Sequence, residues 1–432
     1  MGELDAFWMP FTAGRQFRAR PRMLTGAKDM HYVTDDGREV LDGTAGLWCT
    51  NLGHGREEIT RAVADQMAQM DYAPSYQMGH PLAFELAERL VELAPAPFKH
   101  VFFTNSGSES VDTALKIALA YQNLRGKGER LRIIGRHKGY HGTGFGGMAV
   151  GGMGNNRQRF GPGLPVDHLS HTLLPDNAFS RGLPANGAAM ADELLDIIGL
   201  HGADTIAAVI IEPISGSAGI IVPPTGYLER IRGICTDHDI VLIFDEVITA
   251  FGRLGAAFAA EEFGVVPDIM TTAKGLTNGT IPMGAVLTTS AIHEVFMHAP
   301  PEDIEFFHGY TYSGHPVACR AALASLDLYA RDEVFTHARK VRQVFEDCAH
   351  ELATSRANVT DVRNYGLMAG IEIAPRDGPS RTYEIFEKCF FEEDLMIRFT
   401  GNVLAISPPL IISEAQIRDL FDKVGRTIDR VN

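Results

Sequence analysis

Residues 240–246 read Ile-Val-Leu-Ile-Phe-Asp-Glu, and residues 268–275 read Asp-Ile-Met-Thr-Thr-Ala-Lys-Gly. Each stretch contains a short, β-rich run, which is typical of a strand buried on both faces of a parallel sheet. The first run ends at Asp245 and Glu246 and the second at Lys274, so charged side chains follow both predicted strands. Two carboxylates at the end of a buried strand cost free energy unless a cation or hydrogen-bond donors meet them.

Asp245 and Lys274 are separated by about the length of one strand–helix–strand crossover, with a helix expected near residues 258–263. Parallel strands joined in this way end at the same sheet edge, where open α/β sheets bind ligands. One interpretation is a partly buried ion pair that closes the edge. The other is pyridoxal phosphate chemistry, in which a lysine with a lowered pKa forms a Schiff base with the cofactor aldehyde and an aspartate keeps the pyridine nitrogen protonated.

Composition narrows the classes of protein. The chain has 432 residues, 45% of them hydrophobic, and a formal net charge of −15, so we expect a globular protein without a general footprint for nucleic acid or anionic membranes. Its five cysteines are dispersed and never form a C-x-x-C pair, which indicates no disulfide framework, no metal site and a reducing cytoplasm. No apolar run is long enough for a signal peptide or a membrane span.

Two further strands are predicted to end at polar turns. Residues 206–211 form an apolar run that leads into Glu212, and residues 101–103 lead into Asn-Ser-Gly-Ser-Glu at 105–109 and then a helix. A small-residue turn before a helix N-terminus can bind a phosphate group. The alternative is an ordinary capping box, with Ser106 and Glu109 three residues apart.

The glycine run between residues 139 and 154 contains Gly142-x-Gly144-x-x-Gly147, which fits the dinucleotide-binding fingerprint. We expect no helix after it, and the fingerprint alone has a high false-positive rate, so a nicotinamide dehydrogenase is disfavoured. Trp48, one of two tryptophans, is either a core anchor or part of a binding pocket.

Several phrases together resemble the class III, pyridoxal-phosphate-dependent aminotransferases. They are Phe244-Asp245-Glu246-Val247, Gly252-Arg253-Leu254-Gly255, Pro267-Asp268-Ile269, Lys274-Gly275, Gly46-Leu47-Trp48-Cys49 and Asn105-Ser106-Gly107-Ser108-Glu109. The resemblance covers essentially the whole chain and is closest to the omega-amino acid:pyruvate group, which includes beta-alanine:pyruvate and amine:pyruvate transaminases. It implies an α/β protein of fold type I, the aspartate aminotransferase-like fold. Residues 1–46 and 326–432 would then form a small α+β domain, and residues 47–325 a large domain with a mainly parallel seven-stranded sheet.

The resemblance also implies roles for individual residues. Lys274 and Asp245 would be catalytic, and the cofactor would be bound by Gly107, Ser108, Tyr140, Glu212, Asp245, Val247, Lys274 and Thr311. Tyr140 and Val247 would cover the two faces of the pyridine ring. Thr311 would contact the phosphate held by the neighbouring subunit, so a homodimer with shared active sites is expected, possibly assembled into a tetramer. The substrate pocket would contain Trp48, Ser217, Arg398 and Tyr76 of the partner subunit.

One turn bears on the choice of substrate. Family members that use glutamate and 2-oxoglutarate typically read Glu-Pro-Ile-Gln-Gly-Glu, whose last acid masks a mobile arginine, whereas this chain has Ser215 and Ser217 at the variable positions. Because serine cannot neutralise Arg398, we expect pyruvate as the acceptor and beta-alanine, taurine or a primary amine as the donor. A class III aminotransferase that uses 2-oxoglutarate, and a decarboxylase or aminomutase of the same fold, are the alternatives.

Overall fold

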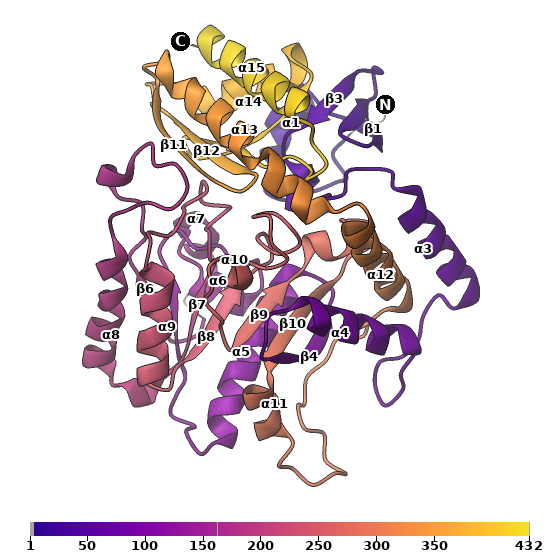
Figure 1. Ribbon diagram of the computed structural model, residues 1–432, viewed down its shortest axis with the longest axis vertical. Helices are drawn as coiled ribbons and strands as arrows, with labels where there is room; N and C mark the ends of the chain where they lie inside the picture. The colour runs from indigo at the N-terminus through magenta and orange to yellow at the C-terminus, as the bar shows by residue number, and fades with distance from the viewer. Residues whose placement is uncertain (1–3, 162, 432) are drawn as a thin grey trace.

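The computed structural model describes residues 4–161 and 163–431, and a seven-stranded sheet lies at its centre (Figure 1). In spatial order the strands are β4 (Phe98–Thr104), β10 (Gly284–Thr289), β9 (Ile269–Thr272), β8 (Val241–Asp245), β7 (Ile206–Ile211), β5 (Arg132–Arg136) and β6 (Val166–Leu169). All neighbours run parallel except β10, which is antiparallel to both β4 and β9. This order confirms the expected α/β fold with a mainly parallel seven-stranded sheet.

Alternate residues of the central strands enter two different cores. Leu242 and Phe244 of β8 belong to a large hydrophobic cluster on one face of the sheet, whereas Val241 and Ile243 belong to a second cluster on the other face. Both faces are therefore buried, which explains why the strand is apolar throughout instead of alternating with polar residues.

Helices cover both faces of this sheet (Figure 1). On the side of the smaller cluster lie α5 (Gly107–Leu124), α6 (Phe145–Val150) and α11 (Ser290–Phe296). The opposite side is covered by α4 (Pro81–Leu93), α8 (Glu193–His201), α9 (Tyr227–Asp237) and α12 (Pro316–Arg331), with α3 (Glu57–Gln69) packed on α12. Shorter elements of this part are α2 (Ala45–Trp48), α7 (Gly154–Arg157), α10 (Ala259–Glu262), η1 (Pro175–Asn177), η2 (Ala188–Asp192), η3 (Ala203–Thr205) and η4 (Lys274–Thr277).

Two four-stranded sheets lie at the top of the view in Figure 1, near the two chain ends. One joins β1 (Leu24–Lys28), β2 (His31–Thr34) and β3 (Glu39–Asp42) to the two-residue strand β13 (Leu395–Met396). The other contains β11 (Val359–Tyr365), β12 (Met368–Ile373), β15 (Val403–Ile406) and β14 (Arg398–Thr400). Beside them are α1 (Gly14–Ala19), α13 (Val334–Thr354), α14 (Arg381–Glu392) and α15 (Glu414–Arg430).

The division into residues 1–46, 47–325 and 326–432 stays a prediction, and residues 1–3 and 432 of its end segments lie outside the described residues. The parallel pairing of β13 with β3 does bring the N-terminal strands beside the C-terminal part of the chain. Within residues 4–161 and 163–431, no helix combines the length and the apolar character needed to cross a membrane.

The expectation of no helix after the glycine fingerprint was wrong, because α6 begins at Phe145 inside the glycine run. The run packs on α5, where the Asp112 carboxylate accepts a hydrogen bond from the N–H of Gly147 at 2.8 Å. A Cβ atom at Gly144 would lie 2.1 Å from an Asp112 carboxylate oxygen. Close approach to α5 therefore explains a glycine at this position.

Candidate active site

The two carboxylates after β8 point to different partners. Glu246 is fully buried and accepts hydrogen bonds from the N–H groups of Ala259 and Ala260, at 2.6 and 2.8 Å, at the start of α10. Burial raises the pKa of Glu246 to about 7. The Glu246 carboxylate therefore caps a short helix. Of the two carboxylates after β8, Asp245 is the one that remains for chemistry at the sheet edge.

Asp245 is held in one orientation by three donors. One carboxylate oxygen lies 2.8 Å from Nδ1 of His141, and the other accepts hydrogen bonds from the N–H of Val247 at 3.1 Å and the hydroxyl of Thr271 at 3.2 Å. An ionised carboxylate accepts but does not donate, so Nδ1 of His141 carries the proton in this contact. His141 is a site residue that sequence reasoning missed, although its place beside Tyr140 after β5 was a usable signal.

Lys274 begins the turn after β9, the strand next to β8, and its backbone has the left-handed angle φ = 50°. Its amine has no hydrogen-bond or ion-pair partner among the residues that the structure describes. Burial lowers the pKa of this amine from 10.5 to about 8, and the charge of Asp245 opposes part of that change. The expected acid and amine therefore lie at one sheet edge, as the crossover argument predicted, and they form no closed ion pair.

The end of β7 contributes a third carboxylate. Glu212 is buried, accepts a hydrogen bond from the N–H of Tyr140 at 2.9 Å and another from the N–H of Gly216 at 3.2 Å. Burial raises the pKa of the Glu212 carboxyl. In the same turn the Ser215 hydroxyl accepts a hydrogen bond from the buried Arg136 at 2.7 Å. Ser215 is thus committed to a protein partner, and Ser217 is only half-buried.

The N-terminus of α5 faces the residue that follows the Asp245–Glu246 pair. A Cβ atom at Gly107 would lie 2.8 Å from Cγ1 of Val247, so glycine is required for this approach. The hydroxyl of Ser106 caps the helix by accepting from the N–H of Glu109, which satisfies the capping alternative. The next hydroxyl, Ser108, accepts from the N–H of Thr143 at 3.0 Å.

Arg398 lies on β14, in a different sheet from β9, which precedes Lys274, and its charge acts on both Lys274 and Tyr140. Its side chain is half-buried, and burial lowers its pKa. No carboxylate of the described chain forms an ion pair with this guanidinium. A half-buried cation that has no carboxylate partner in the described chain is suited to bind a carboxylate ligand.

Three expected substrate or cofactor residues are not grouped with Lys274, Asp245 and Glu212: one is buried in the core and two are exposed on the surface. Trp48 is only 2% exposed and packs in a core cluster with Ile214, Ile248 and Met368. Tyr76 is 58% exposed, and Thr311 is exposed, with its carbonyl accepting a hydrogen bond from Tyr72 at 3.0 Å. No contact within the described chain joins these two exposed residues to Lys274.

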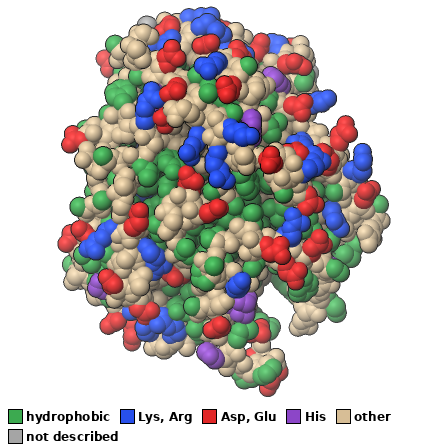
Figure 2. Space-filling model, viewed as in Figure 1, with side chains coloured by type: hydrophobic (Ala, Val, Ile, Leu, Met, Phe, Trp, Pro, Cys, Tyr) green, Lys and Arg blue, Asp and Glu red, His purple; other side chains and the backbone are tan. Residues whose placement is uncertain are grey.

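The geometry suits a planar, phosphate-bearing aldehyde cofactor. Lys274 offers an amine of lowered pKa, Asp245 offers an oriented carboxylate, and the α5 N-terminus at Gly107 offers free N–H groups beside Val247. In the described part of the chain, no group of three or more His, Cys, Asp or Glu side chains is arranged to hold a metal ion. Hydrophobic side chains show in the middle of the face in Figure 2, between the part with α13 and α15 and the part with the large sheet.

Comparisons with known proteins identify the family of the chain. The sequence model described as aminotransferase class-III matches residues 14–428. An omega-aminotransferase of Caulobacter vibrioides is 54% identical over 434 residues, which span 100% of this chain and 98% of that protein. A beta-alanine–pyruvate aminotransferase of Pseudomonas aeruginosa is 48% identical over 99% of this chain and 96% of its own. The solved structure of an amine transaminase from an uncultivated Pseudomonas species, in its PLP-bound form, has a TM-score of 0.93 at 33% identity and covers 100% of both chains.

Proposed function

The chain belongs to the class-III aminotransferases, and from this premise we propose that it moves an amino group from an omega-amino acid or a simple amine to pyruvate. The observation that carries the choice of acceptor is the unpaired Arg398 guanidinium, together with Ser217 at the position where an acid would mask it. The beta-alanine–pyruvate aminotransferase of Pseudomonas aeruginosa has pyruvate and an omega-amino acid in its name, which supports the same substrates.

The cofactor of this enzyme class is pyridoxal phosphate. When bound, it supplies an aldehyde that takes up the amino group and a pyridinium ring that acts as an electron sink. Lys274 would hold the aldehyde, Asp245 the ring nitrogen, and the α5 N-terminus at Gly107 and Ser108 the phosphate. Tyr140 and Val247 would lie on the two faces of the ring, with Glu212 anchoring Tyr140 through its N–H.

Lys274 is proposed to move the proton during the reaction. An amine with a pKa of about 8 is partly neutral near neutral pH, so its Nζ can take a proton from the reacting carbon of the donor. The protonated amine can then give up this proton as a general acid. In this scheme His141, Val247 and Thr271 hold the Asp245 carboxylate in one orientation through their hydrogen bonds. Lys274 would therefore carry the proton, while Asp245 keeps a fixed position.

Arg398 is proposed to bind the carboxylate of pyruvate. An amino donor without a carboxylate next to its reacting carbon leaves this guanidinium without a partner, and Ser217 cannot neutralise it. We infer that Arg398 then turns toward solvent, because leaving an unpaired cation in a buried pocket costs free energy. A small keto acid should consequently be preferred to 2-oxoglutarate.

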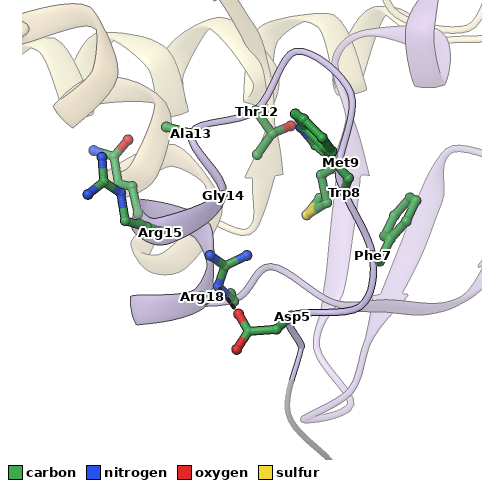
Figure 3. A pocket seen from close by; sticks show the side chains of 10 residues that line it. Asp5, Phe7, Trp8, Met9, Thr12, Ala13, Gly14, Arg15 and Arg18 are labelled. Carbon is green, nitrogen blue, oxygen red and sulfur yellow. Dashed lines mark ion pairs between the residues drawn. The ribbon is translucent and has the colours of Figure 1, made fainter.

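We also propose a homodimer with shared sites, in which Thr311 reaches the phosphate held by a second copy and Tyr76 reaches its pocket. Exposed aromatic side chains support this assembly, since a monomer rarely leaves so many uncovered. Trp8 is 95% exposed, and Phe7, Phe11, Phe84 and Phe307 are also exposed. Figure 3 shows Phe7 and Trp8 beside a cavity of about 590 Å³ in the N-terminal segment, where Asp5 pairs with Arg18.

A cytoplasmic location stays a prediction, which the absence of cysteine pairing among the five described cysteines supports.

Single-turnover measurements test the proposal. The purified protein should show a visible absorption band that borohydride bleaches, and the amino-loaded enzyme should react faster with pyruvate than with 2-oxoglutarate. Equal rates with the two keto acids would refute the acceptor assignment. Release of carbon dioxide from the donor, without transfer of its amino group, would replace the proposal with a decarboxylase.

A further inference from the structure

The segment between β3 and α3 adopts a backbone that its own residues do not favour. Ala45, Gly46 and Trp48 have φ angles of 46°, 63° and 66°. Left-handed angles suit glycine, but alanine and tryptophan carry a Cβ atom that clashes in this region. Contacts from outside the local backbone must therefore hold the turn that presents Trp48.

The Asp42 carboxylate supplies those contacts. Asp42 is 0% exposed, and its oxygens accept hydrogen bonds from the N–H of Thr44 at 2.8 Å, the Thr44 hydroxyl at 3.1 Å and the N–H of Gly46 at 2.7 Å. Nε2 of the buried His54 completes the set at 2.8 Å. Two backbone N–H groups and the His54 ring donate to one buried carboxylate, while the single proton of the Thr44 hydroxyl is shared with the carbonyl of Gly46 at 2.8 Å, which makes the arrangement stiff.

His54 is itself fixed in place. Its ring packs against Tyr32 with a centroid distance of 4.2 Å, and its backbone exchanges hydrogen bonds with Asp29 at 2.8 and 2.9 Å. Because an ionised carboxylate only accepts, Nε2 of His54 carries the proton toward Asp42. His54 thus orients the carboxylate that in turn orients the strained turn.

The same turn contacts the loops around the candidate active site. Trp48 belongs to the same core cluster as Ile214, two residues after Glu212, and Ile248, directly after Val247. Its indole N–H has no hydrogen-bond partner among the described residues, so only packing and the turn backbone hold the ring. Cys49 meets the Lys274 turn, because a Cβ atom at Gly279 would lie 2.9 Å from its sulfur.

We propose that Asp42 and His54 are positioning residues for the aminotransferase reaction: they hold the strained Ala45–Trp48 turn, and with it the Trp48 indole, in the core cluster that it shares with Ile214 and Ile248 of the loops after Glu212 and Val247. This inference rests on the proposed function, because a shift of these loops alters catalysis only if the site binds an amino donor. Its physical core, the immobilisation of Trp48 by the Asp42–His54 pair, can be measured without cofactor or substrate.

Tryptophan fluorescence gives the first test, since Trp8 and Trp48 are the two tryptophans of the sequence. In a Trp8→Phe background, emission reports Trp48 alone and should be blue-shifted and protected from acrylamide. Adding His54→Leu should shift the emission to the red and raise quenching several-fold at unchanged circular dichroism, and Asp42→Asn should act in the same direction. His54→Gln keeps an N–H donor and should restore most of the protection. Unchanged quenching in the His54→Leu protein would overturn the proposal.

Kinetics give the second test, with beta-alanine as a small donor and 1-phenylethylamine as a bulky one. A positional change of Trp48 should alter the ratio of their kcat/KM values by about tenfold in His54→Leu, since small misplacements near a reacting group have large effects. His54→Leu should have little further effect in a Trp48→Ala background. A merely structural role would lower both kcat/KM values equally and would overturn the proposal. If the parent fails to use pyruvate, the proposed function fails, whereas the fluorescence result still decides the anchoring of Trp48.

Discussion

The proposed functional side chains are buried at the strand ends of this molecule but exposed on its outer loops. At the ends of β7 and β8, Glu212 and Asp245 are buried and each accepts hydrogen bonds from more than one donor. On the loops outside the sheet, Tyr76 and Thr311 are exposed. In the first region the carboxylates find their hydrogen-bond donors within one chain, whereas in the second region the side chains face solvent.

This difference in burial suits the two regions to different tasks: the sheet edge to catalysis, and the outer loops to contact with a second copy. A buried carboxylate or amine acquires an altered pKa only when its surroundings are fixed, and a folded sheet edge supplies that rigidity. An exposed hydroxyl such as that of Thr311 gains a role only when another surface covers it. Under the proposed function, each copy would therefore contain its own Asp245 and Lys274, and its Tyr76 and Thr311 would contribute to the site of the other copy.

The largest effect should come from the lysine at the buried strand end. Lys274→Ala removes the proposed proton carrier and should slow turnover by about 10² to 10⁴-fold. Stopped-flow absorbance of the half-reaction with the amino donor measures the change, and Lys116→Ala on the surface of α5 serves as a matched lysine control. Near-normal half-reaction rates in Lys274→Ala would break the assignment of chemistry to this region.

Next in size is the unpaired arginine. Arg398→Ala removes a charge-assisted contact worth about 1.5 to 3 kcal/mol, so the pyruvate half-reaction should slow by roughly 10 to 150-fold. The half-reaction of a carboxylate-free amine donor should be spared. Comparable losses in both half-reactions would show that Arg398 supports the fold of the site and does not select the acceptor.

The buried amine should also make stability depend on pH. In the folded chain the pKa of Lys274 is lowered from 10.5 to about 8, so between these values the unfolded chain binds more protons and the free energy of unfolding rises with pH. Below the lower value both states are protonated and the destabilisation is fully present. Relative to Lys274→Met, the cofactor-free protein should gain about 3 kcal/mol across this interval. Urea unfolding measures the difference, and a pH-independent difference would contradict the lowered pKa.

The smallest effect should come from the exposed loop. Thr311→Val removes one hydroxyl and should weaken cofactor binding by about 1 kcal/mol, or roughly fivefold, while Thr311→Ser should bind normally. Mixing Thr311→Val with Lys274→Ala chains should create dimers in which one of the two sites carries neither substitution. Because Thr311→Val chains alone stay active at high cofactor concentration, the mixed dimers are assayed for cofactor affinity, and failure of mixing to restore normal affinity would break the idea that the outer loops serve a second copy.

Sequence reasoning predicted the sheet well because its strands are short, apolar and followed by charged residues, as at Asp245 and Lys274. It could not decide which of Asp245 and Glu246 caps a helix, since that depends on where α10 begins in space. It missed the Asp245–His141 contact, which joins residues on two different strand connections. The helix α15 was also not predicted, although Ser413 and Gln416 form a capping box at its start.

The pairing of β3 with β13 has a consequence for how the chain folds during synthesis. Arg38 and Asp394 beside this pairing are hydrogen-bonded across 356 residues of sequence. The N-terminal sheet can therefore close only after residues 395–396 have left the ribosome, because they form its last strand. Asp245 and Lys274 emerge well before Arg398, which opens β14, the strand after β13. A nascent chain would thus assemble the strands that precede its acid and lysine first, and the arginine would join them more than a hundred residues later.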